Sequence, residues 1–271
     1  MGLRLDNAKR LYMEGIRDGN PREAVERYTG ERYTQHSTGV RDGKEGFIAF
    51  FEDFLARNPE RDIEIVRGFE DGRYVFVQAA QVLNGGEFRY ITADIFDTDD
   101  RGRMIEHWDV IAEMADQSAS GRTQIDGPTE PTALDRTEEN RALVTGFLDE
   151  VLVGGRFDRV TDYVSAEGFA QHNPQVEDGI EGLLAFAEGL ADAGIRFSYR
   201  EVHRVVACGS LVAALSHADI GDAEFAIVDL FRVADGEIVE HWDCLLYTSP
   251  SPRDERRYRV CRLLLEKGGG G

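Results

Sequence analysis

Apolar residues follow two different spacings along this chain, and the same order of spacings occurs twice. Near the N-terminus, residues 7–18 carry apolar side chains at helical intervals, at Leu11, Met13 and Ile16. After Pro59 the apolar residues alternate with polar ones, which is the pattern of a strand with one buried face. A helical part followed by a sheet part predicts an α+β organisation.

In the first half, the pattern predicts three helices and then four strands. The expected helices cover residues 7–18 and 21–28, and a third begins after Asp42, where Asp-Gly-Lys-Glu has the spacing of a capping box. The expected strands cover residues 62–70, 73–83, 87–97 and 103–113. Gly-containing turn signals separate them.

The second half repeats this order of elements. Its expected helices cover residues 138–153, 156–164 and 179–192. Its expected strands cover residues 195–207, 210–220, 224–234 and 237–243. We therefore expect one domain over 1–114, a polar and turn-rich linker over 115–136, and a second domain over 137–243.

The repeat extends to individual polar residues. Residues 33–47 recur at 169–183, residues 94–96 at 229–231, and residues 105–109 at 239–243. The offsets of 134 to 136 residues indicate a duplicated domain, because solenoid repeats run to roughly 20–50 residues. The shared residues are mostly His, Asp, Gln and Trp, which are more typical of functional sites than of packing.

Strand alternation decides which of these side chains share a face. His107 and Asp109 lie on one face of their predicted strand, and Trp108 lies on the other. The preceding strand places Asp94 and Phe96 on one face. Whether Asp94 lies beside His107 depends on the register of the hairpin.

The second half carries the equivalent residues His241, Asp243 and Asp229. A three-residue turn at Gly236 would place Asp229 opposite His241, and a two-residue turn would place it opposite Trp242. A histidine and two carboxylates that face an apolar cavity would suit proton transfer, because burial raises a carboxyl pKa and a nearby imidazolium lowers it. The alternative interpretation is a polar pair that braces the sheet.

Composition excludes several classes of partner. The formal charge of −20 argues against a nucleic-acid partner. No apolar run approaches the ~18–20 residues of a membrane span, and the N-terminus lacks the pattern of a signal peptide, so we expect a cytoplasmic protein. No familiar spacing of metal ligands occurs, so no metal site is predicted. The acidity and the scarcity of Lys indicate either a salt-rich habitat or a GC-rich genome.

Residues 244–271 differ in composition from the rest of the chain. They hold six of the 31 basic residues, only three of the 51 acidic ones, and a terminal run of Gly. The stretch that begins at Cys244 resembles the translation of a transposase adapter used in DNA sequencing libraries. We therefore expect a non-native tail whose residues past about 250 pack little against the body, the alternative being a natural basic tail.

The combined motifs resemble the SnoaL-like branch of the nuclear transport factor 2-like superfamily. The motifs that carry the resemblance lie at 171–174 (Gln-His-Asn-Pro), 178–182 (Asp-Gly-x-Glu-Gly), 228–232 (Val-Asp-Leu-Phe-Arg) and 235–243. The resemblance implies two cone-shaped α+β domains, each with three helices on a curved antiparallel sheet. It also implies that the domains pack sheet to sheet as an internal pseudo-dimer, and the chain could then be a monomer.

Some relatives of this kind are polyketide cyclases that catalyse aldol condensation without a metal or cofactor. The resemblance therefore implies a cofactor-free lyase or isomerase that removes a proton next to a carbonyl of a small-molecule substrate. The implied catalytic residues are Asp109, His107, Asp94, Asp243, His241 and Asp229. The implied substrate-binding residues are His36, His172, Gln35, Gln171, Phe96, Phe231 and His217. The alternatives are a non-catalytic protein that binds a small ligand in the same pocket, and an interaction module that uses the sheet surface.

Overall fold

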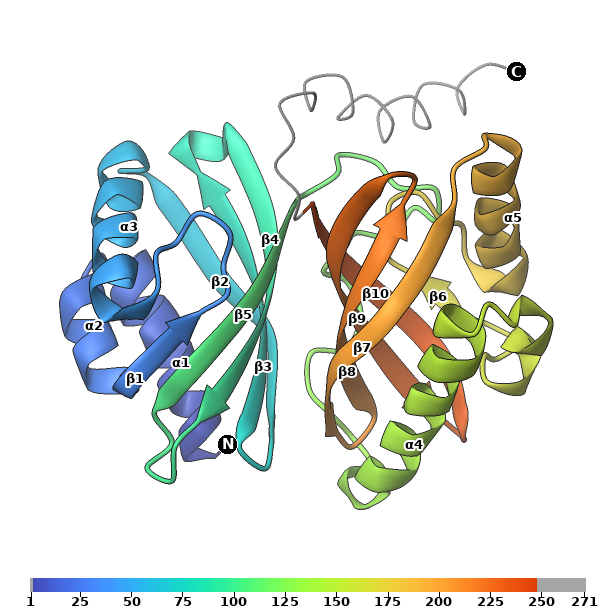
Figure 1. The fold of residues 1–271 in the computed structure, drawn as a ribbon, viewed down its shortest axis with the longest axis horizontal. Helices are drawn as coiled ribbons and strands as arrows, with labels where there is room; N and C mark the ends of the chain where they lie inside the picture. Colours follow the sequence, from blue (N-terminus) through green and yellow to red (C-terminus); the bar gives the residue numbers. More distant parts are fainter. Residues whose placement is uncertain (1, 248–271) are drawn as a thin grey trace.

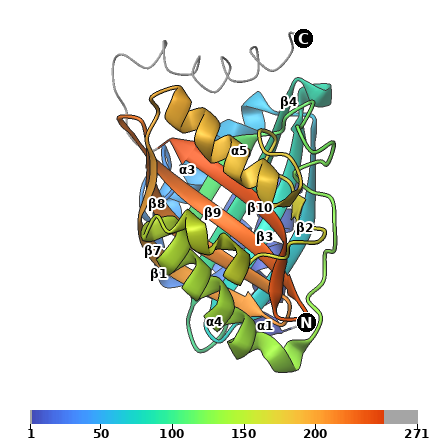
Figure 2. The same cartoon turned by 90° about the vertical axis from the view of Figure 1, so that its right-hand side faces the viewer.

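Two similar α+β units lie side by side in the computed structural model, which describes residues 2–247. A five-stranded sheet from each unit lies towards the middle of the molecule, and the helices cover the outer faces (Figure 1). Figure 2 shows α4 (Thr137–Phe147) and α5 (Gly179–Asp192) lying across the outer face of the second sheet. The predicted fold class is confirmed for both halves.

The first half follows the predicted order of elements closely. Its helical elements are α1 (Leu3–Tyr12), the π-helical turn η1 (Met13–Arg17), α2 (Pro21–Tyr28), α3 (Gly43–Arg57) and the short η2 (Asn84–Gly86). Its strands are β1 (Thr29–Gln35), β2 (Arg61–Asp71), β3 (Tyr74–Leu83), β4 (Phe88–Thr98) and β5 (Met104–Glu113).

The second half contains the same four-strand meander. Besides α4 and α5, its helical elements are η3 (Leu134–Arg136), η4 (Leu148–Val153) and η5 (Phe157–Asp162). Its strands are β6 (Ala170–Gln171), β7 (Phe197–Cys208), β8 (Leu211–Ile220), β9 (Ala223–Ala234) and β10 (Glu237–Tyr247). The helix expected over 156–164 is a 3₁₀-helix instead; this half lacks the Asn20-Pro21 start that α2 has in the first half.

Each sheet has a fifth strand that the sequence analysis did not predict. The strand orders are β1-β5-β4-β3-β2 and β6-β10-β9-β8-β7, and β1 and β6 pair in parallel with β5 and β10. The two-residue β6 has no alternation to detect, and Tyr33 is the one apolar residue among the seven of β1, so the pattern predicted only the antiparallel strands. The parallel pairing places Gln35 beside His107 and Gln171 beside His241.

The hairpin register in the second half matches neither of the two expected registers. Asp235-Gly236 forms a two-residue turn, with φ of 53° and 85°. A bulge between Ile238 and Glu240 then absorbs one residue, so that Asp229 lies opposite Asp243. The type of turn alone therefore does not determine the register, because the bulge adds a shift of one residue.

The two sheets pack against each other through their inner, apolar faces. One buried cluster joins Phe76, Ile95 and Val110 of the first half to Leu230 and Trp242 of the second. Its side chains come from alternate strand positions, so the opposite face of each strand points toward the helices. Burial of this apolar area is what holds the halves together.

Strand β10 continues past Asp243, where the sequence analysis expected it to end. Leu245 and Leu246 pair with Ile227 and Ala226, and the intervening Cys244 is buried. These apolar residues extend the ladder because they match the apolar continuation of β5. The remainder of the expected non-native tail, residues 248–271, lies outside the described residues. Within residues 2–247, no helix is long and apolar enough to cross a membrane.

A buried arginine on β2 holds the linker against the second half. Arg67 is 1% exposed, and it donates to the carbonyl oxygen of Pro128 at 2.8 Å, to that of Asp126, and to Gln78 Oε1 at 2.6 Å. Its guanidinium lies 4.4 Å from the centre of the Trp242 ring. Burial lowers the pKa of Arg67 to about 10, so this residue stays charged at neutral pH.

We expect Arg67→Met to lower the free energy of unfolding by about 3 kcal/mol or more, because it leaves several buried carbonyl oxygens without donors. Urea unfolding measures the loss. The matched control is Arg204→Met on β7, whose guanidinium also stacks on a tryptophan, and we expect that change to cost about 1 kcal/mol. Equal losses in the two variants would contradict this role for Arg67.

Candidate functional site

Four side chains of the first half meet on the helix-facing side of β4 and β5. Asp94 lies opposite Asp109 in the ladder, and Phe96 lies opposite His107, so all four share one face. His107 Nε2 is 2.8 Å from Asp94 Oδ1. The Phe96 ring stacks on the imidazole with 4.4 Å between ring centres. The register that the sequence left open thus places Asp94 beside His107.

The remaining bonds of this cluster orient the imidazole and satisfy Asp94. His107 Nδ1 lies 2.7 Å from Gln35 Oε1, which can only accept, so Nδ1 carries a proton. The Tyr12 hydroxyl donates to Asp94 Oδ2 at 3.2 Å and lies 2.7 Å from Thr92 Oγ1. Asp94 is 1% exposed, so these donors replace the water that it has lost.

The second half builds the same cluster on β9 and β10. His241 Nε2 is 3.0 Å from Asp229 Oδ1, and Nδ1 is 3.0 Å from Gln171 Oε1. Phe231 stacks on the imidazole at 4.8 Å. The hydroxyl of Tyr199 lies 3.1 Å from both oxygens of Asp229.

The two tyrosines come from different elements, although they do the same thing. Tyr12 lies at the end of α1, and Tyr199 lies on β7. At an offset of 136 residues, Leu148 stands where Tyr12 would be, and Ile63 stands where Tyr199 would be. Each half thus supplies one hydroxyl to the buried aspartate from a different side. Neither tyrosine was among the predicted site residues, because neither recurs at its equivalent position in the sequence.

The second aspartate differs between the halves. In the first half, Asp109 Oδ1 is buried and has no hydrogen-bond partner among the described residues. In the second half, Asn173 Nδ2 donates to Asp243 Oδ2 at 2.6 Å. The first half has Ser37 at the position of Asn173, with a shorter side chain. Ser37 still forms a side-chain hydrogen bond with Asp109, which lowers the pKa of that carboxyl, so only Oδ1 of Asp109 lacks a partner among the described residues.

Burial and charge shift the pKa values of the cluster in opposite ways. Burial raises the pKa of the Asp109 carboxyl above its ordinary 3.8; the nearby His107 charge lowers it and Asp94 raises it further. Burial lowers the pKa of His107, but the bond to Asp94 and the charges of both aspartates outweigh burial and raise this pKa above 6.5. His241 and Asp243 shift in the same directions. An imidazolium beside a weakened acid is a suitable arrangement for proton transfer.

Three histidines of the predicted substrate-binding set lie away from these clusters. His36 Nε2 is 2.8 Å from Glu106 Oε1, and its ring stacks on Trp108, on the opposite face of β5. His172 is buried and makes the equivalent contacts in the second half. His217 stacks loosely on His203, with 6.4 Å between ring centres. The structure brings only Gln35, Gln171, Phe96 and Phe231 of that set to the clusters.

Two groups of side chains have the composition of cation ligands. The ligand atoms of Asp94, His107 and Asp109 lie within 4.8 Å of one another, as do those of a second group, His217, Asp219 and Glu224. In the first group the histidine already shares a hydrogen bond with Asp94. In the second group, Arg200 forms ion pairs with both carboxylates.

Two surface hollows of the described residues lie apart from the clusters. One, of about 290 Å³, is lined by linker residues and Pro174. The other, of about 410 Å³, lies between the start of α2 and α3. Neither includes a cluster residue. Asp109 is the partly exposed member of the first-half cluster.

Comparisons with known proteins identify one family whose model matches both halves of the chain. The model of the SnoaL-like domain matches residues 9–107 and 144–241. No curated protein matches the chain. Among solved structures, a candidate ketosteroid isomerase from Kribbella flavida is 22% identical, covers 45% of this chain and 88% of its own, and has a TM-score of 0.36.

Two further solved structures are similar to a part of the chain. An epoxide hydrolase of the LEH-like type from M. tuberculosis is 20% identical, with 48% of this chain and 92% of that chain covered and a TM-score of 0.34. A candidate polyketide cyclase from Bacillus cereus is 20% identical, with 39% and 71% covered and a TM-score of 0.35.

We expect Tyr12→Phe and Tyr199→Phe each to lower the free energy of unfolding by about 1–3 kcal/mol, because each removes a donor from a buried carboxylate. Thermal unfolding measures both. The control is Tyr28→Phe, whose hydroxyl donates to Glu14 at a less buried position, and which should cost less. If the control costs as much as the other two, the hydroxyls do not have this special role.

Proposed function

We propose that this chain, which belongs to the SnoaL-like domain family, uses its first half to remove a proton next to the carbonyl of a small-molecule substrate. The observation that carries the proposal is Asp109. One of its oxygens is buried and unpaired among the described residues, and burial raises the pKa of its carboxyl. Such a carboxylate is a stronger base than an exposed one and has a lone pair directed at no protein donor.

In the proposed reaction, Asp109 takes a proton from the carbon beside the carbonyl, and the C–H electron pair moves into the enolate. Tyr33 donates its O–H to the enolate oxygen. This residue can do so because Gln35 Nε2 donates to the Tyr33 oxygen at 3.3 Å, and because burial and the charge of Asp109 raise its pKa well above 10. The imidazolium of His107 offsets the enolate charge.

The proton and the electrons then return without a cofactor. In an isomerisation, Asp109 gives its proton back at another carbon of the enolate. In an aldol condensation, the enolate carbon attacks a second carbonyl, a C–C bond forms, and the new alkoxide takes the proton. Asp94, Gln35 and Tyr12 act by holding the imidazole of His107 in place.

The second half supports a different role for its copy of the site. Asn173 donates to Asp243 Oδ2, and this bond opposes the rise in the pKa of Asp243 that burial causes, so it weakens this carboxylate as a base. We therefore propose that the second half binds a small ligand without catalysis, and that the two halves form an internal pseudo-dimer through their packed sheets.

We expect Asp109→Asn to lower any proton exchange by about 100-fold or more, because the amide cannot accept the substrate proton. Exchange of small carbonyl compounds in D₂O, followed by NMR, measures this, and circular dichroism checks the fold. Asp243→Asn is the matched control and should leave the rate within about twofold, because the second-half copy is not the base. An undiminished rate in Asp109→Asn removes that residue as the base.

The rate should follow a bell-shaped dependence on pH. Asp109 must be ionised to accept a proton, so kcat/KM rises with pH through a pKa above 3.8. His107 must be protonated to offset the enolate, so kcat/KM falls as pH rises through a pKa above 6.5. The two limbs belong to the coupled cluster rather than to either residue alone. A rate that keeps rising to pH 10 would show that the imidazolium has no part.

A further inference from the structure

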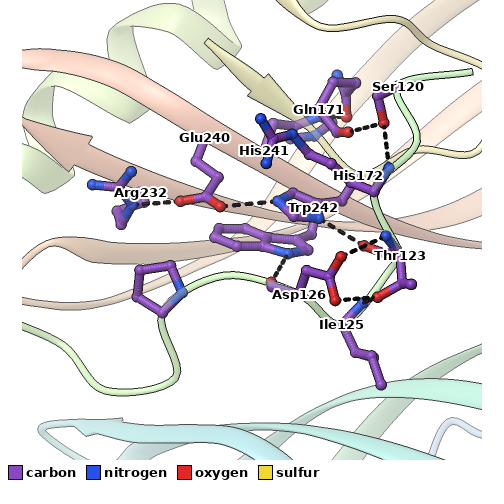
Figure 3. Close-up of polar contacts among 12 residues, drawn as sticks. Ser120, Thr123, Ile125, Asp126, Gln171, His172, Arg232, Glu240, His241 and Trp242 are labelled. Atoms are coloured by element: carbon purple, nitrogen blue, oxygen red, sulfur yellow. Dashed lines mark hydrogen bonds and ion pairs between the residues drawn. The ribbon is translucent and has the colours of Figure 1, made fainter. Parts of the chain in front are cut away.

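Two of the six histidines of this chain, His203 and His217, have no hydrogen-bond partner among residues 2–247. The ring nitrogens of the other four are bonded to side chains or to the backbone. Figure 3 shows this for His172, which is bonded to Glu240 and to the carbonyl oxygen of Thr123. His203 Nδ1, by contrast, lies 3.8 Å from a carboxylate oxygen of Glu201, which is beyond hydrogen-bond distance. A neutral imidazole whose nitrogen has no partner can serve as a metal ligand.

The β8–β9 hairpin brings two carboxylates to these imidazoles. His217 and Asp219 are two residues apart on β8 and so share a face, and Asp219 lies opposite Glu224 on β9. The ligand atoms of these three residues lie within 4.8 Å of one another. The His203 ring, on β7, lies nearly parallel to that of His217, with 6.4 Å between ring centres. We call these four residues the His217 group.

The His217 group is separate from the second-half cluster, because the sheet lies between them. Asp229 of that cluster lies opposite Ala214, three positions before His217 on β8, and therefore on the other face. The preceding residue on the face of His217 is Leu215, which belongs to the buried cluster between the two sheets. His217 and Asp219 are only half-buried. The group thus lies at the end of the inner face, where an ion can reach it from solvent.

Arg200 already holds the two carboxylates of the group together. Its Nε is 2.5 Å from Asp219 Oδ2, and its Nη1 is 3.1 Å from Glu224 Oε1. The guanidinium makes no hydrogen bond to His203 or His217 among the described residues. A divalent cation would bring twice the charge of Arg200 and would bind the imidazole nitrogens as well as the carboxylates.

The first half has no equivalent of this group. In the matching hairpin of β3 and β4, the ladder positions of His217, Asp219 and Glu224 are occupied by Ala80, Val82 and Arg89. None of these three side chains is a metal ligand. The His217 group is therefore a feature of the second half alone, unlike the paired clusters on the helix-facing sides of the sheets.

We propose that the His217 group binds a divalent transition-metal ion with the ligand preferences of Zn²⁺. His217, Asp219 and Glu224 would be ligands, and His203 would supply a fourth. Imidazole with carboxylate suits zinc and its neighbours, whereas Mg²⁺ and Ca²⁺ prefer oxygen ligands alone.

Modest side-chain movements would complete the site. Tetrahedral zinc with bonds of about 2.1 Å places its ligand atoms roughly 3.4 Å apart, so some of these atoms would have to move closer together. Half-exposed side chains can make that movement. Arg200 would release the carboxylates, and the ion would join β7, β8 and β9.

The test titrates Zn²⁺ alone into the full-length protein, after removal of metals with a chelator, and measures binding by isothermal titration calorimetry. We expect saturable binding with one ion per chain at this group. His217→Asn should weaken binding by about tenfold or more, because it removes a ligand while keeping a side chain of similar polarity. His36→Asn is the matched control, since His36 is also half-exposed and lies beside a carboxylate, and it should leave the affinity unchanged.

A further variant gives the opposite result if the proposal is correct. Arg200→Gln should strengthen Zn²⁺ binding by about threefold or more, because it removes the cation that competes for the two carboxylates. A purely structural role of Arg200 predicts weaker binding instead, and that result would contradict the proposal.

The unaltered protein supplies one more comparison, so misfolding of a variant cannot obscure the outcome. Mg²⁺ should bind about 100-fold or more weakly than Zn²⁺, because imidazole is a poor ligand for it. Equal binding of the two ions would mean a general attraction to acidic side chains and would overturn the proposal. The same holds for Zn²⁺ binding that His217→Asn leaves unchanged, and for binding that is lost in His107→Gln instead, since the ion would then lie elsewhere.

Discussion

Two carboxylates that face each other across a buried ladder repel each other unless a nearby cation offsets their charge. In this chain Asp94 lies opposite Asp109, and Asp229 lies opposite Asp243. The neighbouring imidazole supplies the cation, because its pKa is raised by the same two carboxylates. The glutamine from the parallel strand and the stacked phenylalanine hold that imidazole in place. Most features of both clusters follow from this one electrostatic requirement.

Both halves have this arrangement of carboxylates and imidazole, but different residues surround it in each half. The tyrosine that donates to the buried aspartate comes from α1 in one half and from β7 in the other. In the first half, one oxygen of the second aspartate has no partner among the described residues, whereas in the second half Asn173 donates to this aspartate. The opposite face of β5 carries Trp108, and the opposite face of β10 carries Trp242. A histidine and an arginine lie against each tryptophan, and the linker covers Trp242. Each strand therefore serves the candidate site on one face and the contact between halves on the other.

The sequence predicts the helices, the strands and the shared face of the clusters, because alternation follows directly from the geometry of a strand. It does not predict the register, because the bulge after Ile238 has no compositional signal. It also does not predict Tyr12 and Tyr199, which reach the site from non-equivalent elements. His36 and His172 recur at the expected offset, yet they face the other way, because the parallel strands β1 and β6 end just before them. Recurrence in the sequence therefore shows that a residue has the same position in both halves, but it does not show which face of the sheet the side chain lies on.

In each half, a protonated imidazole lies beside the two facing carboxylates and offsets their charge. The direct test is a pH titration of ¹⁵N-labelled protein by NMR, which reports the protonation of both ring nitrogens of His107 and His241. Variants with His107→Gln or His241→Gln assign the signals. An exposed histidine, with an ordinary pKa near 6.5, is neutral well above that pH. We expect both rings to remain doubly protonated there, because their pKa values are raised. Rings that lose a proton at or below that value would contradict it.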